Sequence, residues 1–176
     1  MKVKNDVYKR DLQILLWCVR SHSYCRFIAF IRVISKSGDG YIQLLLPSMI
    51  AIIEPVSGKY FLLLCLLAFA IERPLYFILK KTLKRRRPPE VIPYFCSLVT
   101  PSDQFSFPSG HTMAAFLLAS LCCLIYGAAA YPLYLWAMLV GCSRVILGVH
   151  FPTDILAGAL LGSVMAYLSV HIFTLL

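Results

Sequence analysis

Three short stretches hold most of the unusual polar residues of this sequence. The last of them brings together four side chains that could act on one substrate: Ser143, Arg144, His150 and Asp154. An aspartate four residues after a histidine can accept the proton of one ring nitrogen, which fixes the tautomer and leaves the other nitrogen basic. Such an imidazole is suited to proton transfer or to nucleophilic attack. A purely structural pair of Arg144 and Asp154 is the alternative, but that pair would not explain the histidine.

The second stretch, Pro108, Ser109, Gly110 and His111, comes directly before an apolar run that begins at Met113. Ser109 is a suitable N-cap for a helix, and Gly110 lets a ligand approach the backbone. The free amides of a first helical turn bind anions, so His111 would stand beside a bound anion. A plain serine-capped helix start is the alternative if these four residues act alone.

The first stretch along the chain is a basic block that begins at Lys80 and ends at Arg87 and Pro88. Seven residues are almost two helical turns, so Lys80, Lys84 and Arg87 are expected to share a face, with Pro88 ending the helix. An ammonium group and a bidentate guanidinium together suit a phosphate group. An ordinary basic flank beside a membrane helix explains this block equally well.

The composition indicates an integral membrane protein. Of the 176 residues, 60% are hydrophobic and 14% charged, with a mean hydropathy of +0.77, whereas soluble domains are roughly 45–50% apolar and about 25% charged. These values exclude a soluble monomer and a disordered chain, and an odd number of cysteines, seven, argues against a disulfide-stapled secreted domain. We expect the net charge of +9 to face membrane phosphate and not nucleic acid.

Apolar segments flank and separate the three polar stretches. A spanning helix needs about 20 mostly apolar residues. We predict spans within five ranges: 41–53, 61–79, 113–125, 133–149 and 155–176. The expected fold class is all-α, a polytopic membrane helix bundle of about five spans plus an N-terminal amphipathic or broken helix. Because successive spans alternate in direction, all three polar stretches should lie on the same face of the membrane.

The N-terminal part differs from the other apolar segments. Its two apolar halves, within 12–34, are separated by Arg20, His22 and Arg26. An arginine in the middle of a span costs roughly 2.5–3.5 kcal/mol. We therefore predict an interfacial amphipathic segment over 1–36, followed by a membrane-embedded core over 37–176.

Together, the three stretches resemble the signature of the type 2 phosphatidic acid phosphatases, a family that shares its helical core with vanadium haloperoxidases and glucose-6-phosphatase. The family pattern is Lys-x6-Arg-Pro, Pro-Ser-Gly-His and Ser-Arg-x5-His-x3-Asp. All of its fixed positions are present in order: Lys80, Arg87, Pro88, Pro108, Ser109, Gly110, His111, Ser143, Arg144, His150 and Asp154. Each motif alone is weak evidence, whereas their joint occurrence at these spacings is strong.

The resemblance implies a role for each of these residues. It makes His150 the nucleophile that forms a phosphohistidine, Asp154 its orienting partner, and His111 the general acid for the leaving group. It assigns five residues to the phosphate oxygens: Lys80, Arg87, Ser109, Gly110 and Arg144. The family uses no metal and no cofactor, and Asp154 is the single acidic residue within the three motifs.

The function implied by the resemblance is that of a membrane lipid phosphatase acting on a phosphate mono- or diphosphate ester. The candidate substrates are undecaprenyl diphosphate, phosphatidylglycerophosphate, phosphatidic acid and the phosphates of lipid A, because the motifs contact only the phosphoryl group. A non-catalytic lipid-phosphate binding or transport protein is the alternative. A haloperoxidase is disfavoured, since the relatives of that kind are soluble.

The expected location is a bacterial inner membrane, which the chain would cross several times. The cations of residues 80–87 favour a cytoplasmic site by the positive-inside rule. Part of this charge is explained by phosphate binding, however, and the bacterial relatives generally face outward, so we expect the site on the periplasmic face. The expected partners are a lipid substrate and the bilayer, without nucleic acid, and the sequence leaves the oligomeric state open.

Overall fold

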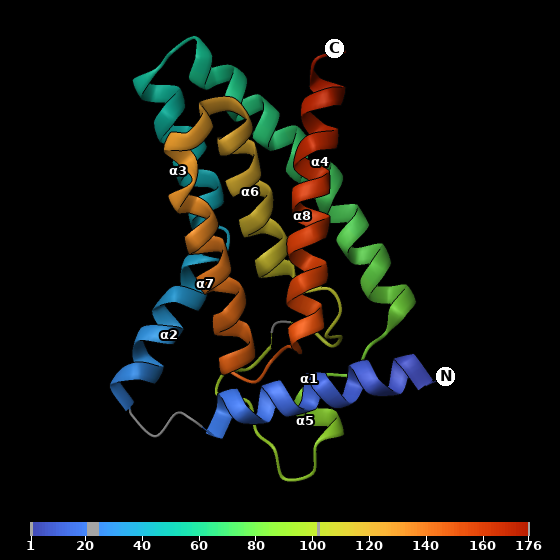
Figure 1. Ribbon diagram of the computed structural model, residues 1–176. Coiled ribbons are helices and arrows are strands. Elements are labelled where there is room, and N and C mark those ends of the chain that lie inside the picture. Colours follow the sequence, from blue (N-terminus) through green and yellow to red (C-terminus); the bar gives the residue numbers. More distant parts are fainter. Residues whose placement is uncertain (1, 21–24, 102, 176) are drawn as a thin grey trace.

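The computed structural model describes residues 2–20, 25–101 and 103–175, and this part of the chain consists of helices and loops without a strand. The helices, in chain order, are α1 (Lys2–Arg20), α2 (Cys25–Ser37), α3 (Tyr41–Ile53), α4 (Ser57–Leu83), α5 (Pro88–Val91), α6 (Gly110–Tyr126), α7 (Pro132–Ile146) and α8 (Pro152–Phe173). A 3-10 turn, η1 (Gly127–Ala130), joins α6 to α7. The predicted all-α fold class is confirmed (Figure 1).

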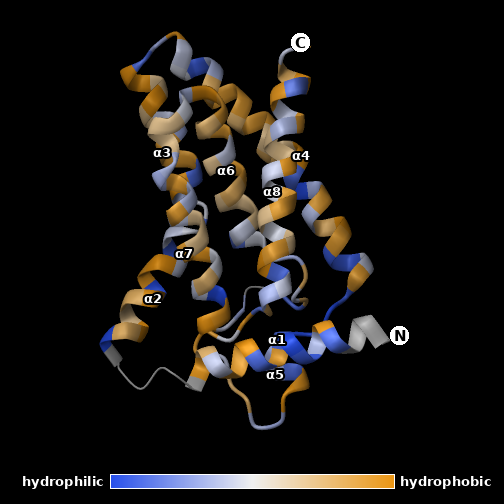
Figure 2. Ribbon diagram, in the orientation of Figure 1, coloured by the Kyte–Doolittle hydropathy of each residue, from blue (hydrophilic) through white to orange (hydrophobic). Residues whose placement is uncertain are grey.

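Three helical segments of the described chain are long and apolar enough to cross a membrane: Ser57–Val91, Gly110–Ala130 and Pro152–Phe173. The apolar helices α3 and α7 are shorter, with 13 and 15 residues, so the predicted number of about five spans is approximate. Hydrophobic residues dominate the helices along the bundle, whereas α1 mixes hydrophilic and hydrophobic positions (Figure 2). The chain is therefore an integral membrane protein.

Helix α6 is the central element and packs against α4, α7 and α8. Its approach to α8 is close because glycines of α8 face it. A Cβ atom on Gly158 would lie 2.8 Å from the carbonyl oxygen of Ser109, and one on Gly162 would lie 2.2 Å from that of Met113. These two contacts fix the start of α8 beside the start of α6.

Helix α4 ends earlier than the sequence predicts. It stops at Leu83, because Lys84 takes a left-handed backbone conformation with a φ of 45°. Pro88 therefore does not end α4; it begins α5 and drives Arg87 into an extended conformation. Lys84 is exposed, whereas Lys80 and Arg87 are both buried. The expectation that these three cations share one helical face is therefore wrong.

The three polar stretches meet at one end of the bundle, as the alternation of spans predicts. Helices α4 and α7 end there, and α6 and α8 begin there (Figure 1). The loop between α5 and α6 crosses the same end. Residues from four different elements can therefore contribute to a single site.

The N-terminal segment forms two helices, α1 and α2, on either side of residues 21–24, which lie outside the described part. The predicted break at His22 falls within these residues. Helix α1 runs across the end of the bundle where α8 begins, and α2 packs along α7 (Figure 1). The position of residues 1–36 at the membrane interface and the division at residue 36 stay predictions.

Candidate functional site

His150 lies in the turn between α7 and α8 and is 2% exposed. The turn passes through Gly148, whose φ of 75° favours glycine. Nη1 of Arg87 approaches Nε2 of His150 to 3.3 Å. Because a guanidinium can only donate, Nε2 carries the lone pair and the ring proton sits on Nδ1. Nδ1 lies 3.6 Å from Oδ2 of Asp154, which is longer than a hydrogen bond.

The charge state of His150 is set by its surroundings. Burial lowers the pKa of its imidazole to about 4, the positive charges of Arg87 and Arg144 act in the same direction, and Asp154 opposes them. The ring is therefore neutral at pH 7. A neutral imidazole with a free lone pair is the form that can attack an electrophile.

Asp154, in the first turn of α8, is fully buried and hydrogen-bonded on both oxygens. Oδ1 accepts from Nη1 of Arg85 at 2.7 Å. Oδ2 accepts from the amide of Phe151 at 2.8 Å and from the hydroxyl of Ser106. These bonds hold the carboxylate beside His150 and satisfy a charge that would otherwise be costly to bury.

The two cations predicted to bind phosphate, Lys80 and Arg87, both contact one carboxylate, Asp103. Nζ of Lys80 lies 2.5 Å from Oδ2 and Nη2 of Arg87 lies 2.6 Å from Oδ1. Tyr76 donates its hydroxyl proton to Oδ2 at 2.7 Å. Although burial opposes ionisation, the bonds from Lys80 and Tyr76 lower the pKa of Asp103 to about 2. A permanent internal anion thus lies where both cations meet.

His111, in the first turn of α6, lies on the other side of the site. Its Nε2 is 2.6 Å from Oδ1 of Asp39, in the turn between α2 and α3. Arg144 is buried near the end of α7 and donates to Oγ of Ser35 at 2.6 Å. Nε of Arg144 has no hydrogen-bond partner within the described residues. This arginine therefore retains a free donor.

Ser109 and Gly110 occupy the predicted start of α6. Ser109 is the N-cap residue, but its Oγ pairs with Oγ1 of Thr112 at 2.9 Å and does not cap the helix amides. A Cβ atom on Gly110 would lie 2.8 Å from the ring of Tyr76. The glycine therefore allows α4 and α6 to approach each other at this point.

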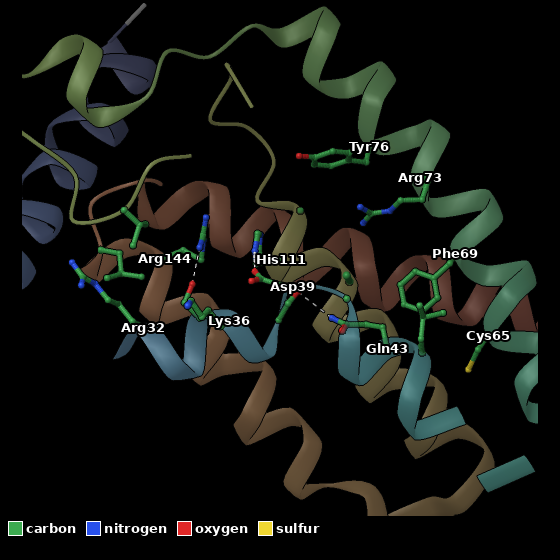
Figure 3. Close-up of a pocket in the computed structure, with 18 of the residues that line it drawn as sticks. Arg32, Lys36, Asp39, Gln43, Cys65, Phe69, Arg73, Tyr76, His111 and Arg144 are labelled. Carbon is green, nitrogen blue, oxygen red and sulfur yellow. Dashed lines mark hydrogen bonds and ion pairs between the residues drawn. The ribbon is translucent and has the colours of Figure 1, made fainter. Parts of the chain in front are cut away.

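A cavity of about 660 Å³ opens beside these residues, between α2, α3, α4 and α6 (Figure 3). His111, Gly110 and Arg144 form part of its wall. Arg32, Lys36 and Arg144 stand at one end of the cavity, and Phe69 and Cys65 stand at the other (Figure 3). Further apolar wall residues come from α3 and α4: Leu44, Leu62 and Leu66. One cavity therefore joins a basic end to an apolar end.

The site has two halves. His150, Asp154, Arg87 and Lys80 form a buried half behind the cavity wall, and His111 with Arg144 forms the half that lines the cavity. Val149 links the two halves, because its amide donates to the carbonyl oxygen of Arg144 at 3.1 Å and its own carbonyl accepts from Nη1 of Arg87 at 2.7 Å. The predicted residues thus lie together at one end of the bundle, but of these only Gly110, His111 and Arg144 line the cavity.

The motifs did not reveal four polar partners of these residues: Asp39, Arg85, Asp103 and Ser106. Asp39 and Asp103 are two of only eight acidic residues in the chain. An acidic residue in such a basic sequence tends to pair with a cation, so the scarcity of acids could have predicted Asp39 and Asp103 as partners of the site residues. Within the residues that the structure describes, no group of three or more His, Cys, Asp or Glu side chains is arranged to hold a metal ion.

Comparison with known proteins agrees with this architecture. The model of the PAP2 superfamily matches residues 59–176, and the chain belongs to that superfamily. It resembles the crystal structure of "the first transmembrane PAP2 type phosphatidylglycerolphosphate phosphatase from Bacillus subtilis", with a TM-score of 0.78 and 29% identity over 98% of this chain and 88% of that chain. The recognised family and the all-α membrane fold are therefore confirmed.

Two curated relatives carry functional names. Phosphatidylglycerophosphatase B of Bacillus subtilis (strain 168) is 41% identical over an alignment of 121 residues that covers 60% of this chain and 55% of that protein. Undecaprenyl-diphosphatase of Sulfolobus acidocaldarius is 31% identical over 146 residues, 79% of this chain and 67% of that protein. The chain thus spans about half the length of the first of these relatives.

Proposed function

We propose that this protein is a membrane lipid phosphatase that works through a phosphohistidine. The observation that carries the proposal is the buried His150, whose Nε2 lies 3.3 Å from Nη1 of Arg87 and whose Nδ1 lies 3.6 Å from Asp154. The relatives named as phosphatases support the reaction class. Hydrolysis of phosphate esters is very slow without catalysis, so positioned cations and a covalent intermediate must lower most of the barrier.

The proposed reaction has two steps. Nε2 of His150 forms a bond to phosphorus while the bond from phosphorus to the leaving oxygen breaks, and His111 gives that oxygen a proton. His111 then takes a proton from water, the resulting hydroxide attacks phosphorus, and the nitrogen–phosphorus bond breaks to release inorganic phosphate. Lys80, Arg87 and Arg144 stabilise the oxygens that gain charge, without a metal. For a diphosphate, the leaving group is a lipid monophosphate.

The proposed phosphate position is the junction between the two halves of the site. The phosphate must displace the carboxylate of Asp103 from Lys80 and Arg87, and it reaches Arg144 from the cavity side, because Arg144 is part of the cavity wall. The amide of Gly110 and the hydroxyl of Ser109 complete the oxygen contacts at the start of α6.

The proposed substrates are lipids with a terminal phosphate, either monoesters or diphosphates. The basic end of the cavity suits their headgroup and the apolar wall of α3 and α4 suits their chain. The names of the relatives make phosphatidylglycerophosphate and undecaprenyl diphosphate the first lipids to test, followed by phosphatidic acid and lipid A phosphates.

The decisive experiment measures phosphate release from this lipid panel by the purified protein in detergent. We expect turnover of at least one lipid in the presence of a metal chelator, inhibition by vanadate, and no activity in His150→Ala. His171→Ala, which changes an exposed histidine on α8, is the matched control and should keep full activity. Lipid binding without turnover would replace the enzyme with the binding or transport protein. An active His150→Ala enzyme would remove the assigned nucleophile.

We propose an inner-membrane location with the site on the outer face. Cys96 is exposed in the loop between α5 and α6, at the end of the bundle that carries the site. In a variant that keeps only this cysteine, a membrane-impermeant maleimide should label Cys96 in intact spheroplasts. Labelling only after lysis would place the site in the cytoplasm.

A further inference from the structure

One face of α1 packs directly on the residues that flank the site. Leu15 is fully buried and clusters with Val145 and Phe151, each of which adjoins a motif residue in sequence. The ring centroid of Tyr8 lies 6.1 Å from that of Phe151. Asp11, between these two residues of α1, is 2% exposed. The spacing of three and four residues places all three side chains on one helical face.

Asp11 supplies the helix cap that α8 lacks. Helix α8 begins with Pro152, which has no amide proton, and its N-cap residue Phe151 has no polar side chain. The amide of Thr153 donates to Oδ1 of Asp11 at 3.1 Å, and the Thr153 hydroxyl donates to Oδ2 at 2.5 Å. A carboxylate from α1 thus stands at the positive end of α8, where an anion is stabilising.

Arg85 connects Asp11 to Asp154. Its Nη2 lies 2.6 Å from Oδ2 of Asp11, and its Nη1 donates to Oδ1 of Asp154 at 2.7 Å and to Oγ1 of Thr153 at 2.6 Å. Its guanidinium carbon also lies 4.4 Å from the ring centroid of Phe151. One arginine is therefore shared between two buried carboxylates, of which one stands beside the nucleophile.

From these contacts we propose that Asp11 is a positioning residue of the catalytic centre. It holds Arg85 and the first turn of α8 so that Asp154 faces His150, and it offsets part of the charge of Arg85 so that Asp154 remains basic. The inference rests on the proposed role of His150. Asp11 lies outside the residues 59–176 that match the superfamily model, so α1 adds to the site a group that the three motifs do not contain.

The test compares Asp11→Asn with the unchanged protein in the lipid assay. The amide removes the negative charge but keeps the size of the side chain. We expect kcat to fall about tenfold with KM changed less than about twofold, because the substrate does not touch Asp11. Asp11→Glu should recover part of the loss. Asp6→Asn changes an exposed acid on the same helix and should leave kcat unchanged.

A second readout separates positioning from a general loss of structure. The charged groups that face His150 are Arg87 from the loop after α4, Arg144 from α7 and Asp154 from α8. Without Asp11, Arg85 attracts Asp154 more strongly, so Asp154 stabilises the protonated form of His150 less. The acid limb of the kcat/KM profile should move to lower pH in Asp11→Asn. In Arg85→Gln it should move to higher pH.

The outcomes distinguish the inference from the proposed function. If the unchanged protein hydrolyses no lipid, the proposed function is wrong, and the positioning role of Asp11 is wrong with it. If it is active and Asp11→Asn has the same kcat and the same acid limb, only the positioning role is wrong. Should Asp11→Asn prove unfolded by thermal denaturation, Thr153→Val removes the shared hydroxyl and keeps the carboxylate. An unchanged kcat in that variant would also overturn the proposal.

Discussion

At the scale of single residues, Asp103 has the clearest effect on the site. Its carboxylate lies between Lys80 and Arg87 with short contacts to both. A phosphate dianion at the proposed position would compete with it for the same two cations. The carboxylate also keeps the two buried positive charges of Lys80 and Arg87 close together, which would otherwise repel each other.

Replacing Asp103 by Asn should relieve this competition while keeping the hydrogen bond to Arg87. We expect vanadate to inhibit Asp103→Asn more strongly than the unchanged protein, by about 1 kcal/mol or roughly fivefold in the inhibition constant. Steady-state inhibition kinetics measure this. Weaker inhibition would mean that Asp103 mainly holds Arg87 in place for the substrate.

The buried state of His150 predicts an unusual acid limb. Only the neutral ring can attack phosphorus, and its pKa in the free protein lies near 4, below the usual value of about 6.5. As the pH falls from 7, the loss of kcat/KM that comes from protonation of His150 should therefore begin below pH 6.5, as the pH approaches the lowered value. A pH–rate profile with folding monitored at each point tests this. An acid limb at 6.5 would contradict the burial of the ring.

At the scale of elements, the contact between α6 and α8 holds the two histidine-bearing segments together. The backbones approach closely at Gly162, and no side chain fits there. Because Gly158 faces the carbonyl of Ser109 in the same way, the start of α6 is tied to the start of α8. The position of His111 relative to His150 thus depends on two glycines.

Gly162→Ala should destabilise this pair of helices. The added methyl group would lie 2.2 Å from the carbonyl oxygen of Met113, and overpacking of this kind costs about 1–3 kcal/mol. Thermal unfolding in detergent measures the loss. Leu160→Ala, on the outward side of α8 with 66% exposure, is the control and should cost less. Equal unfolding temperatures for the two variants would show that α8 can shift without penalty.

The sequence predicts the helices and their direction well, because apolar length and alternation determine both. It also places Ser109 at the start of α6. It fails at the end of α4, since counting residues along a helix assumed that the helix continues to Pro88, whereas Lys84 ends it. The partners of the cations could not be predicted, because Asp39 and Asp103 lie in loops whose path depends on the packed bundle.

At the scale of the whole molecule, the cavity joins the proposed phosphate site to an apolar wall. Its basic end lies at the catalytic end of the bundle, and its apolar wall follows α3 and α4. A lipid bound in this way would keep its chain against apolar side chains while its phosphate reaches His111 and Arg144. The apolar chain of the lipid would then contribute to binding, and its headgroup would take part in the reaction.

Leu66→Trp should narrow the apolar part of the cavity. We expect KM for a long-chain lipid phosphate to rise about tenfold, while hydrolysis of a water-soluble phosphomonoester changes less than about twofold, because only the former needs the apolar wall. Parallel kinetics with both substrates test this. An equal loss for both would indicate damage to the site itself.

The bond between Asp11 and Thr153 joins residues 142 positions apart, and this distance has a consequence for biogenesis. Translation delivers α1 long before α8, so during synthesis the acid of the first helix waits for a partner that emerges later. Under the positioning role proposed for Asp11, the proposed site would be complete only after α1 has packed against α8.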